Sequence, residues 1–461
     1  MERVLPKTID YTDVLPLAVE SKARRRTFFP VNGQSFTASG ANIIRIDISA
    51  DALLDTQHSY LRFTWTNDAA KTCGLDQAGG HAFIRRLRVE QSGTVLEDIN
   101  SYNRLMGAVV LPCQSGYDHA GERGITEGVG QRNGSNTLVT SMTGINNAGI
   151  EGSRAGGFKT QAHDYVPVSG AAADGSSIDM CIPLNSGIFN NEKLIPLMLM
   201  SAPLTIEIEL APVNEPVCFV DTAATDYTIS NVRYIANLVE VGQDVAQQLR
   251  MVQEMSGGVL TLAGQTYRHF TGAVTAGTGD QIINVPARVK SMKSLFFVSQ
   301  AAGNAQNRYN VSQSGNMKLH EYQLKIGSVT YPPTPVRCGF GDGTISNVVA
   351  KRAEPLMELA KAWGSVGGTK GMGQLFNQTY GKTEDAAVAQ GAQVSYCPFG
   401  LDLEAFQRVA IESGVNTADR SLPISLILNY AVAPSACNVD VFVLADALFY
   451  INADGSMSVS V

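Results

Sequence analysis

Strict alternation of apolar and polar residues is the pattern that most constrains the fold of this chain. It is clearest at residues 42–48 (NIIRIDI), 204–210 (LTIEIEL) and 422–428 (LPISLIL). Because successive side chains of a β-strand point to opposite faces, the alternation predicts strands with one buried and one solvated face. With 44% hydrophobic and only 17% charged residues, most of the chain must be packed. The sequence therefore predicts an all-β protein with a substantial core.

The order of predicted elements in the first half returns in the second half, at an offset of roughly 210 to 240 positions. A hairpin over residues 83–99 leads into a short helix after Asn100, and a hairpin over 322–333 precedes a helix after Pro355. A third helix is expected from about Asp244 to Met255. The order indicates two similar sandwiches, divided as follows: an N-terminal arm at 1–26, a first sandwich at 27–242, a helical connector at 243–257 and a second sandwich at 258–461.

Residues 113–175 interrupt the first sandwich with a long glycine-rich stretch that sustains no period. Long loops without internal secondary structure are uncommon in compact domains, and they are often functional. We therefore expect this loop to carry a function or to pack against a neighbouring subunit.

Patterns typical of a catalytic or metal centre do not occur in the sequence. The six histidines are scattered singly, and the seven cysteines form no C-x-x-C pair. The net charge of −7 argues against a protein whose whole surface binds nucleic-acid phosphates. We predict no enzyme activity, no cofactor, no metal and no sequence-specific nucleic-acid binding. A β-rich hydrolase, whose acid pair would form only on folding, remains a minor alternative.

One basic cluster lies just before the first predicted strand, which we expect to begin at Thr27. It consists of four residues: Lys22, Arg24, Arg25 and Arg26. An arm with this charge is suited to contact anionic lipid head groups, nucleic acid or acidic neighbours. The alternative is a solvated arm that only aids solubility. Nothing in the sequence resembles a secretory signal or a membrane-spanning stretch.

Three local patterns resemble one protein family. They are 324–328 (LKIGS) with 331–335 (YPPTP), 182–189 (IPLNSGIF) with 194–197 and 203–210, and the closing stretch 439–455. Together they are similar to the major capsid proteins of double-jelly-roll viruses. That family includes tectivirus-like phages, adenoviruses, virophages, Polinton-like viruses and large nucleocytoplasmic DNA viruses. The resemblance extends over about residues 28 to 455.

The resemblance implies two tandem eight-stranded jelly-roll sandwiches with short helices and long crown loops, that is, a double jelly roll. It implies a structural protein that forms trimeric, pseudo-hexagonal capsomers of an icosahedral shell. The expected partners are other copies of the chain, penton and minor capsid proteins, and an internal membrane where one is present. The loop 113–175 would then lie in the crown or at the trimer interface, and Lys22, Arg24, Arg25 and Arg26 would face the membrane or minor proteins. The protein would be made and assembled in the host cell and reside in the virion.

A carbohydrate-binding or adhesive β-sandwich protein is the alternative function. Such a protein needs exposed aromatic side chains, whereas the two tryptophans, Trp65 and Trp363, both occur in apolar periodic contexts. The resemblance and the duplication favour the capsid interpretation.

Overall fold

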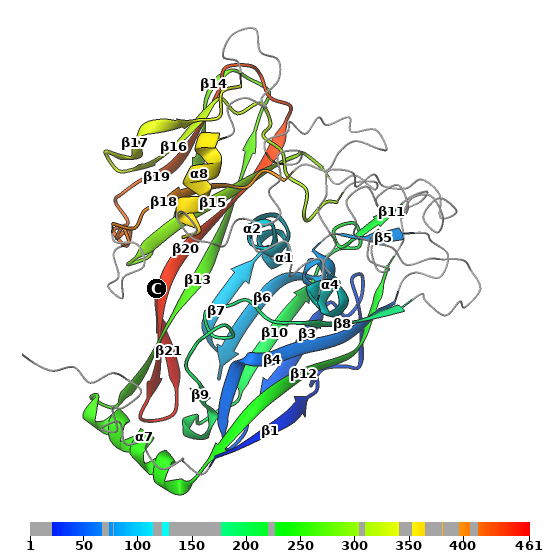
Figure 1. Ribbon diagram of the computed structural model, residues 1–461, viewed down its shortest axis with the longest axis vertical. Helices are drawn as coiled ribbons and strands as arrows, with labels where there is room; N and C mark the ends of the chain where they lie inside the picture. The colour runs from blue at the N-terminus through cyan, green and yellow to red at the C-terminus, as the bar shows by residue number, and fades with distance from the viewer. Residues whose placement is uncertain are drawn as a thin grey trace, which may run out of the picture.

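The computed structural model describes most of the chain. The described residues are 21–66, 73–76, 78–113, 122–128, 177–219, 226–303, 309–340, 353–364, 380, 396–405 and 414–461. They form two β-sandwiches, the first at the lower right of Figure 1 and the second above it. Helix α7 (Gln243–Met255), at the bottom of the view, connects them.

The first sandwich packs a six-stranded sheet, sheet A, on a four-stranded sheet, sheet B. Sheet A has the order β1 (Ser21–Phe28), β12 (Thr228–Val241), β4 (Leu53–Thr66) and β8 (Ser177–Ile182), with β2 (Ser35–Thr37) beside β12 and β9 (Ile195–Pro196) beside β4. Sheet B has the order β3 (Ile43–Ile48), β10 (Leu204–Leu210), β6 (Ile84–Gln91) and β7 (Thr94–Asn100). Strands β5 (Cys73–Leu75) and β11 (Val217–Phe219) form a separate pair.

The second sandwich packs a five-stranded sheet, sheet D, on a four-stranded sheet, sheet E. Sheet D has the order β13 (Val259–Val274), β20 (Cys437–Asn452), β15 (Met292–Ala301) and β18 (Phe399–Asp402), with β21 (Met457–Ser460) beside β20. Sheet E has the order β14 (Gly279–Asn284), β19 (Ile424–Tyr430), β16 (Glu321–Ile326) and β17 (Val329–Arg337).

The two sandwiches share one topology. If the main strands of each are numbered along the chain from one to eight, sheets A and D both have the order one, eight, three, six, and sheets B and E both have two, seven, four, five. All these neighbours pair antiparallel. The predicted repeat of elements is therefore a repeat of the whole fold, with eight main strands in each copy.

Side-chain alternation forms the two cores as the sequence predicts. In β10, Ile206 and Ile208 are buried between the sheets, while Glu207 lies on the outer face beside Arg45 of β3. Buried apolar residues of both sandwiches belong to one continuous hydrophobic cluster. The cores are thus joined, and the two sandwiches do not pack as separate bodies.

Short helices lie where periodicity places them. The helix expected after Asn100 consists of α1 (Tyr102–Arg104), a π-helical stretch η2 (Leu105–Val110) and α2 (Leu111–Cys113), all buried. Helix α8 (Ala353–Ala362) starts just before Pro355, so the proline occupies the first turn, where its missing N–H is tolerated. The remaining helical turns within the described residues are η1 (Gly79–Phe83), α4 (Glu122–Glu127) and η5 (Leu197–Leu199).

The structure moves the start of the first predicted strand and describes only part of the predicted long loop. The first strand begins at Ser21 rather than Thr27, so the last residues of the predicted arm 1–26 belong to β1. Of the predicted loop 113–175, Cys113 and residues 122–128 are described, and the latter contain α4. The rest of that loop lies outside the described residues.

Candidate functional site at the junction of the two sandwiches

The predicted basic cluster lies on β1, at the edge of sheet A. The strand pairs with β12 from Ser21 to Phe28, and all four basic residues are exposed. Arg24 Nε lies 3.1 Å from Glu240 Oε2, and Arg25 Nη2 donates to the Tyr60 hydroxyl at 3.4 Å. The Arg26 guanidinium lies over the Phe28 ring, 5.0 Å from its centroid.

This placement gives the basic cluster a structural role that the sequence does not suggest. An edge strand presents unpaired backbone groups, and exposed charges on it discourage pairing with another chain. Lys22, Arg24 and Arg26 lie on one face of β1 and Arg25 lies on the other, so the cluster forms a charged edge. A charged edge protects the fold and also remains accessible to an anionic partner.

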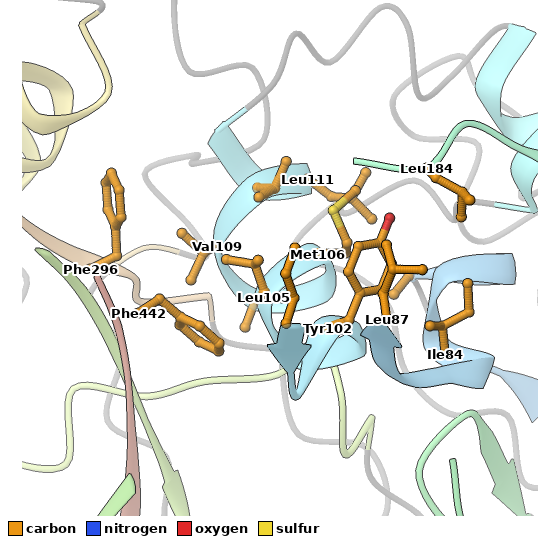
Figure 2. Packing of buried hydrophobic residues seen from close by; sticks show 14 of the residues in the cluster. Ile84, Leu87, Tyr102, Leu105, Met106, Val109, Leu111, Leu184, Phe296 and Phe442 are labelled. Atoms are coloured by element: carbon orange, nitrogen blue, oxygen red, sulfur yellow. The ribbon is translucent and has the colours of Figure 1, made fainter. Parts of the chain in front are cut away.

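The buried helical segment 102–113 forms the apolar centre of the junction. Figure 2 shows Leu105 and Val109 on the side that faces Phe296 and Phe442 of sheet D. All four of these side chains are fully buried. Figure 2 also shows Tyr102 and Met106 of the same segment lying toward the first sandwich. The segment therefore serves as shared core for both sandwiches.

A buried arginine crosses the junction beside this apolar centre. Arg104 Nη1 donates to the carbonyl oxygens of Val311 at 2.7 Å and Gln313 at 2.5 Å. Its Nε lies 3.2 Å from Asp440 Oδ2, and His269 Nε2 lies 2.9 Å from Asp440 Oδ1. Burial raises the pKa of Asp440, but the hydrogen bond from His269 and the charge of Arg104 outweigh it and lower the pKa. The Asp440 carboxylate is therefore held ionised between two partners.

A second buried carboxylate, that of Asp76, accepts hydrogen bonds from backbone N–H groups of both sandwiches. Asp76 Oδ2 accepts hydrogen bonds from the N–H of Val311 at 3.1 Å and of Ser312 at 3.2 Å. Its Oδ1 accepts from the N–H of Ala78 at 3.0 Å. Burial raises the pKa of Asp76, and these N–H groups offset part of the rise. Asp76 thus fastens a loop of the second sandwich to the first.

Two glycines allow the backbones of the sandwiches to touch. A Cβ on Gly187 would lie 2.6 Å from the Gln265 carbonyl oxygen, and one on Gly264 would lie 2.6 Å from the Gly187 carbonyl oxygen. Beside this contact, Glu97 accepts from the N–H of Gly187 at 2.9 Å and of Ile188 at 3.4 Å. Burial raises the pKa of Glu97. Only glycine fits at either position without moving the chains apart.

At the lower end of the junction, Gln91 of β6 joins the turn between β20 and β21. Its Oε1 accepts from the Met457 N–H at 2.5 Å, and its Nε2 donates to the Gly455 carbonyl at 3.1 Å. Figure 1 shows β13 and β20 running from the second sandwich down beside the first as far as α7. The junction therefore extends along much of the length of the first sandwich.

Helix α4 is anchored to the first sandwich by a buried ion pair. Glu127 Oε2 lies 2.9 Å from His81 Nε2, and Arg123 Nε donates to Glu127 Oε1 at 2.7 Å. Burial raises the pKa of Glu127, but the hydrogen bonds and charges of His81 and Arg123 outweigh it and lower the pKa to about 2. The described part of the predicted long loop is thus tied to the sandwich.

The chemistry of these groups is that of a fixed contact. Each buried charge at the junction is partnered by residues of the other sandwich or by backbone groups. Within the described ranges, no group of three or more His, Cys, Asp or Glu residues is placed to hold a metal ion. No helix in those ranges is long and apolar enough to span a membrane. What the junction does is fix the orientation of one sandwich on the other.

Sequence reasoning missed the junction, although one signal was present. Strand β15 carries the nearly continuous apolar run Leu295–Phe296–Phe297–Val298, and β20 carries Val441–Phe442–Val443–Leu444. Such runs are typical of strands that are buried on both faces. The signal could have indicated which sheet is covered, but not by which segment.

Solved structures of viral capsid proteins are similar to this chain. A crystal structure of VP54 from PBCV-1, fitted into a cryo-EM reconstruction of the virophage Sputnik, has a TM-score of 0.58 at 10% identity. That match covers 98% of this chain and 99% of VP54. The Faustovirus major capsid protein has a TM-score of 0.57 at 9% identity, covering 94% of this chain and 91% of that chain.

A cryo-EM structure of Sputnik itself gives a TM-score of 0.56 at 9% identity, over 100% of this chain and 93% of that chain. Neither a protein-family model nor a curated protein sequence matches the chain. This chain therefore has the double-jelly-roll fold of viral major capsid proteins. The fold predicted from the sequence, two tandem eight-stranded sandwiches, is confirmed.

Proposed function

We propose that this chain is the major capsid protein of an icosahedral virus, with a structural role and no turnover of substrate. The observation that carries the proposal is the fixed pair of sandwiches with one topology. Two similar sandwiches in one rigidly joined chain allow three copies to present six similar units around a threefold axis. Such a trimer is a pseudo-hexagonal tile, which can pack against identical tiles in a closed shell and place the protein in the virion.

The junction supports this proposal because a tile must keep its outline. If the sandwiches turned freely, the six units of a trimer would not hold a regular spacing. Close contact of Gly187 with Gly264, and the buried Arg104–Asp440 pair, remove that freedom. The partners of the tile would be neighbouring capsomers, penton proteins and minor capsid proteins. The loop 113–175 would contribute to the crown or the trimer interface.

The charged edge of β1 is the proposed contact for an anionic partner beneath the shell. Four basic residues are exposed there: Lys22, Arg24, Arg25 and Arg26. Among the described residues, Glu240 forms an ion pair with Arg24. Anionic lipid head groups of an internal membrane, or an acidic surface of a minor capsid protein, would complement this edge. Substituting all four residues with Gln should leave the oligomeric state unchanged and weaken that contact.

The alternative of a carbohydrate-binding protein receives no support from the tryptophans. Trp65 is fully buried in the first core, and Trp363 packs edge-on against Phe296 at a centroid distance of 5.6 Å. Trp65 therefore offers no exposed ring, and Trp363 is partly buried against the second core.

Light scattering after size exclusion tests the proposal. Three subunits of 49.2 kDa give a trimer of about 148 kDa. A stable trimer, or larger closed particles, is the expected result. A monomer at every concentration, including after co-expression with minor capsid proteins, would refute the proposal.

A further inference from the structure

Helix α7 carries an apolar strip that the described chain leaves exposed. Met251, Val252 and Met255 are 59%, 50% and 87% exposed. Met251 and Met255 are four positions apart, so they lie on one side of the helix, with Val252 between that side and the core. The opposite side is held by Gln253, whose Nε2 donates to the Ile451 carbonyl at 3.0 Å.

The start of β1, to which residues 1–20 are joined, lies beside this helix. Ser21 pairs with Val241, two positions before α7 begins at Gln243. Paired Cα atoms in an antiparallel ladder are about 5 Å apart. Residues 1–20 could span at most about 72 Å when extended, while α7 is about 20 Å long. The segment is therefore attached next to α7 and is long enough to cover it.

The composition of residues 1–20 fits an apolar surface better than a solvated tail. Half of the 20 residues are apolar, and Leu15, Leu17 and Val19 fall at every second position before β1. Attachment so close to the helix gives this segment a high effective concentration, which a separate partner would lack.

An anionic bilayer fits the same strip poorly. Helix α7 contains Asp244 and Glu254 but only one cation, Arg250, whereas helices that lie on membranes are rich in Lys and Arg. Residues 1–20 contain four acidic and two basic residues, so this segment adds no net positive charge beside the helix.

We propose that residues 1–20 dock on the strip formed by Met251, Val252 and Met255 of the same copy. Docking buries three exposed apolar side chains and fastens the N-terminal segment to the connector between the sandwiches. This contact forms within one chain, so it does not depend on capsid assembly.

Methionine oxidation measures the docking directly. The full chain and a variant lacking residues 1–20 are treated with dilute hydrogen peroxide, and oxidation at each methionine is followed by mass spectrometry. Met357 of α8 is the matched reference because it is 54% exposed and lies on the second sandwich. In the full chain, Met251 and Met255 should oxidise at least about fivefold more slowly than Met357. In the truncated chain, both should oxidise at least as fast as Met357.

A second variant keeps the segment in place and removes its apolar character. L15D combined with L17D should expose Met251 and Met255 in the same way, with circular dichroism unchanged. Equal oxidation of the three methionines in the full chain would overturn the proposal. So would slow oxidation that persists in the truncated chain, which would point to a second copy as the cover. Protection that arises only when phosphatidylglycerol vesicles are added would overturn it in favour of a lipid surface.

Discussion

Strands β4 and β15 hold the same position in the two sandwiches, yet their outer faces differ completely. In β4, Phe63 points into the core, while Arg62 points outward to an ion pair with Asp179 at 2.9 Å. In β15, almost every residue is buried, whichever face of the sheet it points to. Phe296 is buried although it points away from the core between sheets D and E. The outer face of sheet A meets water, whereas much of the outer face of sheet D is covered by helical segments and the first sandwich.

This difference shows how a duplicated fold becomes one asymmetric unit. Had both sheets kept charged outer faces, the sandwiches would remain two bodies on a linker. Burial of the outer face of sheet D fixes the two sandwiches against each other. The remaining faces stay available for contacts between subunits. The comparison predicts that substitutions at corresponding strands have unequal costs.

The largest effect is expected at the apolar centre of the junction. Phe442→Ala should lower the free energy of unfolding by about 3–5 kcal/mol, because it leaves a cavity beside the buried segment 102–113. Arg62→Ala, on the outer face of sheet A, should cost at most about 1 kcal/mol, since its ion pair is partly exposed. Urea unfolding of both variants measures the difference. Equal costs would show that the outer face of sheet D is not the buried one.

Arg104→Ala should cost about 3 kcal/mol, because it leaves the Asp440 carboxylate and two carbonyl groups short of partners in a buried site. Arg86 is the matched control: it pairs with Asp98 at 2.7 Å on the solvated face of sheet B. Arg86→Ala should cost about 1 kcal/mol or less. A double-mutant cycle with Asp440→Asn should give a coupling energy of more than about 1 kcal/mol, and additive effects would contradict a direct pair.

Acid pH should separate the α4 anchor from the junction. The pKa of Glu127 is lowered to about 2 from an ordinary value of 4.5, so its contribution is complete above about pH 4.5 and is lost as the pH falls toward 2. In contrast, burial raises the pKa of Glu97, so its contribution is complete below its ordinary value and is lost as the pH rises through its folded pKa.

Chemical unfolding between pH 2 and 7 measures these slopes. Glu127→Gln should remove about 2 kcal/mol at pH 6 and flatten the acid limb of the stability profile. Glu97→Gln should leave that acid limb unchanged. An identical acid limb in wild type and Glu127→Gln would contradict the ion pair with His81 and Arg123.

The smallest effects are expected at β1, the counterpart of β13 in the first sandwich. Removing residues 1–20 keeps β1 but removes the segment proposed to dock on α7, so it should cost about 1 kcal/mol, the free energy that corresponds to fivefold protection. Removing residues 1–26 deletes most of an exposed edge strand and should cost about 1–2 kcal/mol while leaving the trimer folded. Only the longer truncation removes the charged edge, so it should also impair shell assembly. Normal particles from that truncation would count against a role for this edge.

The sequence predicted the local elements well because their causes are local. Alternation located β10, turn residues located the hairpin of β6 and β7, and helical periodicity located α7. The junction depends on contacts between distant residues. Arg104 and Asp440 are 336 positions apart, and no local pattern links them.

The basic cluster illustrates the same limit. Residues 21–26 (SKARRR) contain five polar residues and no alternation with large apolar residues. The sequence alone therefore suggests a solvated arm. Pairing with β12, which lies more than 200 positions further along the chain, makes this stretch a strand. Its charge was visible in the sequence, but its position at a sheet edge was not.

Electron microscopy of the purified oligomer tests the central claim most directly. Class averages viewed along the threefold axis should show six lobes of similar size at nearly equal spacing, two from each subunit. A three-lobed particle, or a subunit whose two sandwiches vary in relative orientation, would contradict the account of a duplicated and rigidly joined tile.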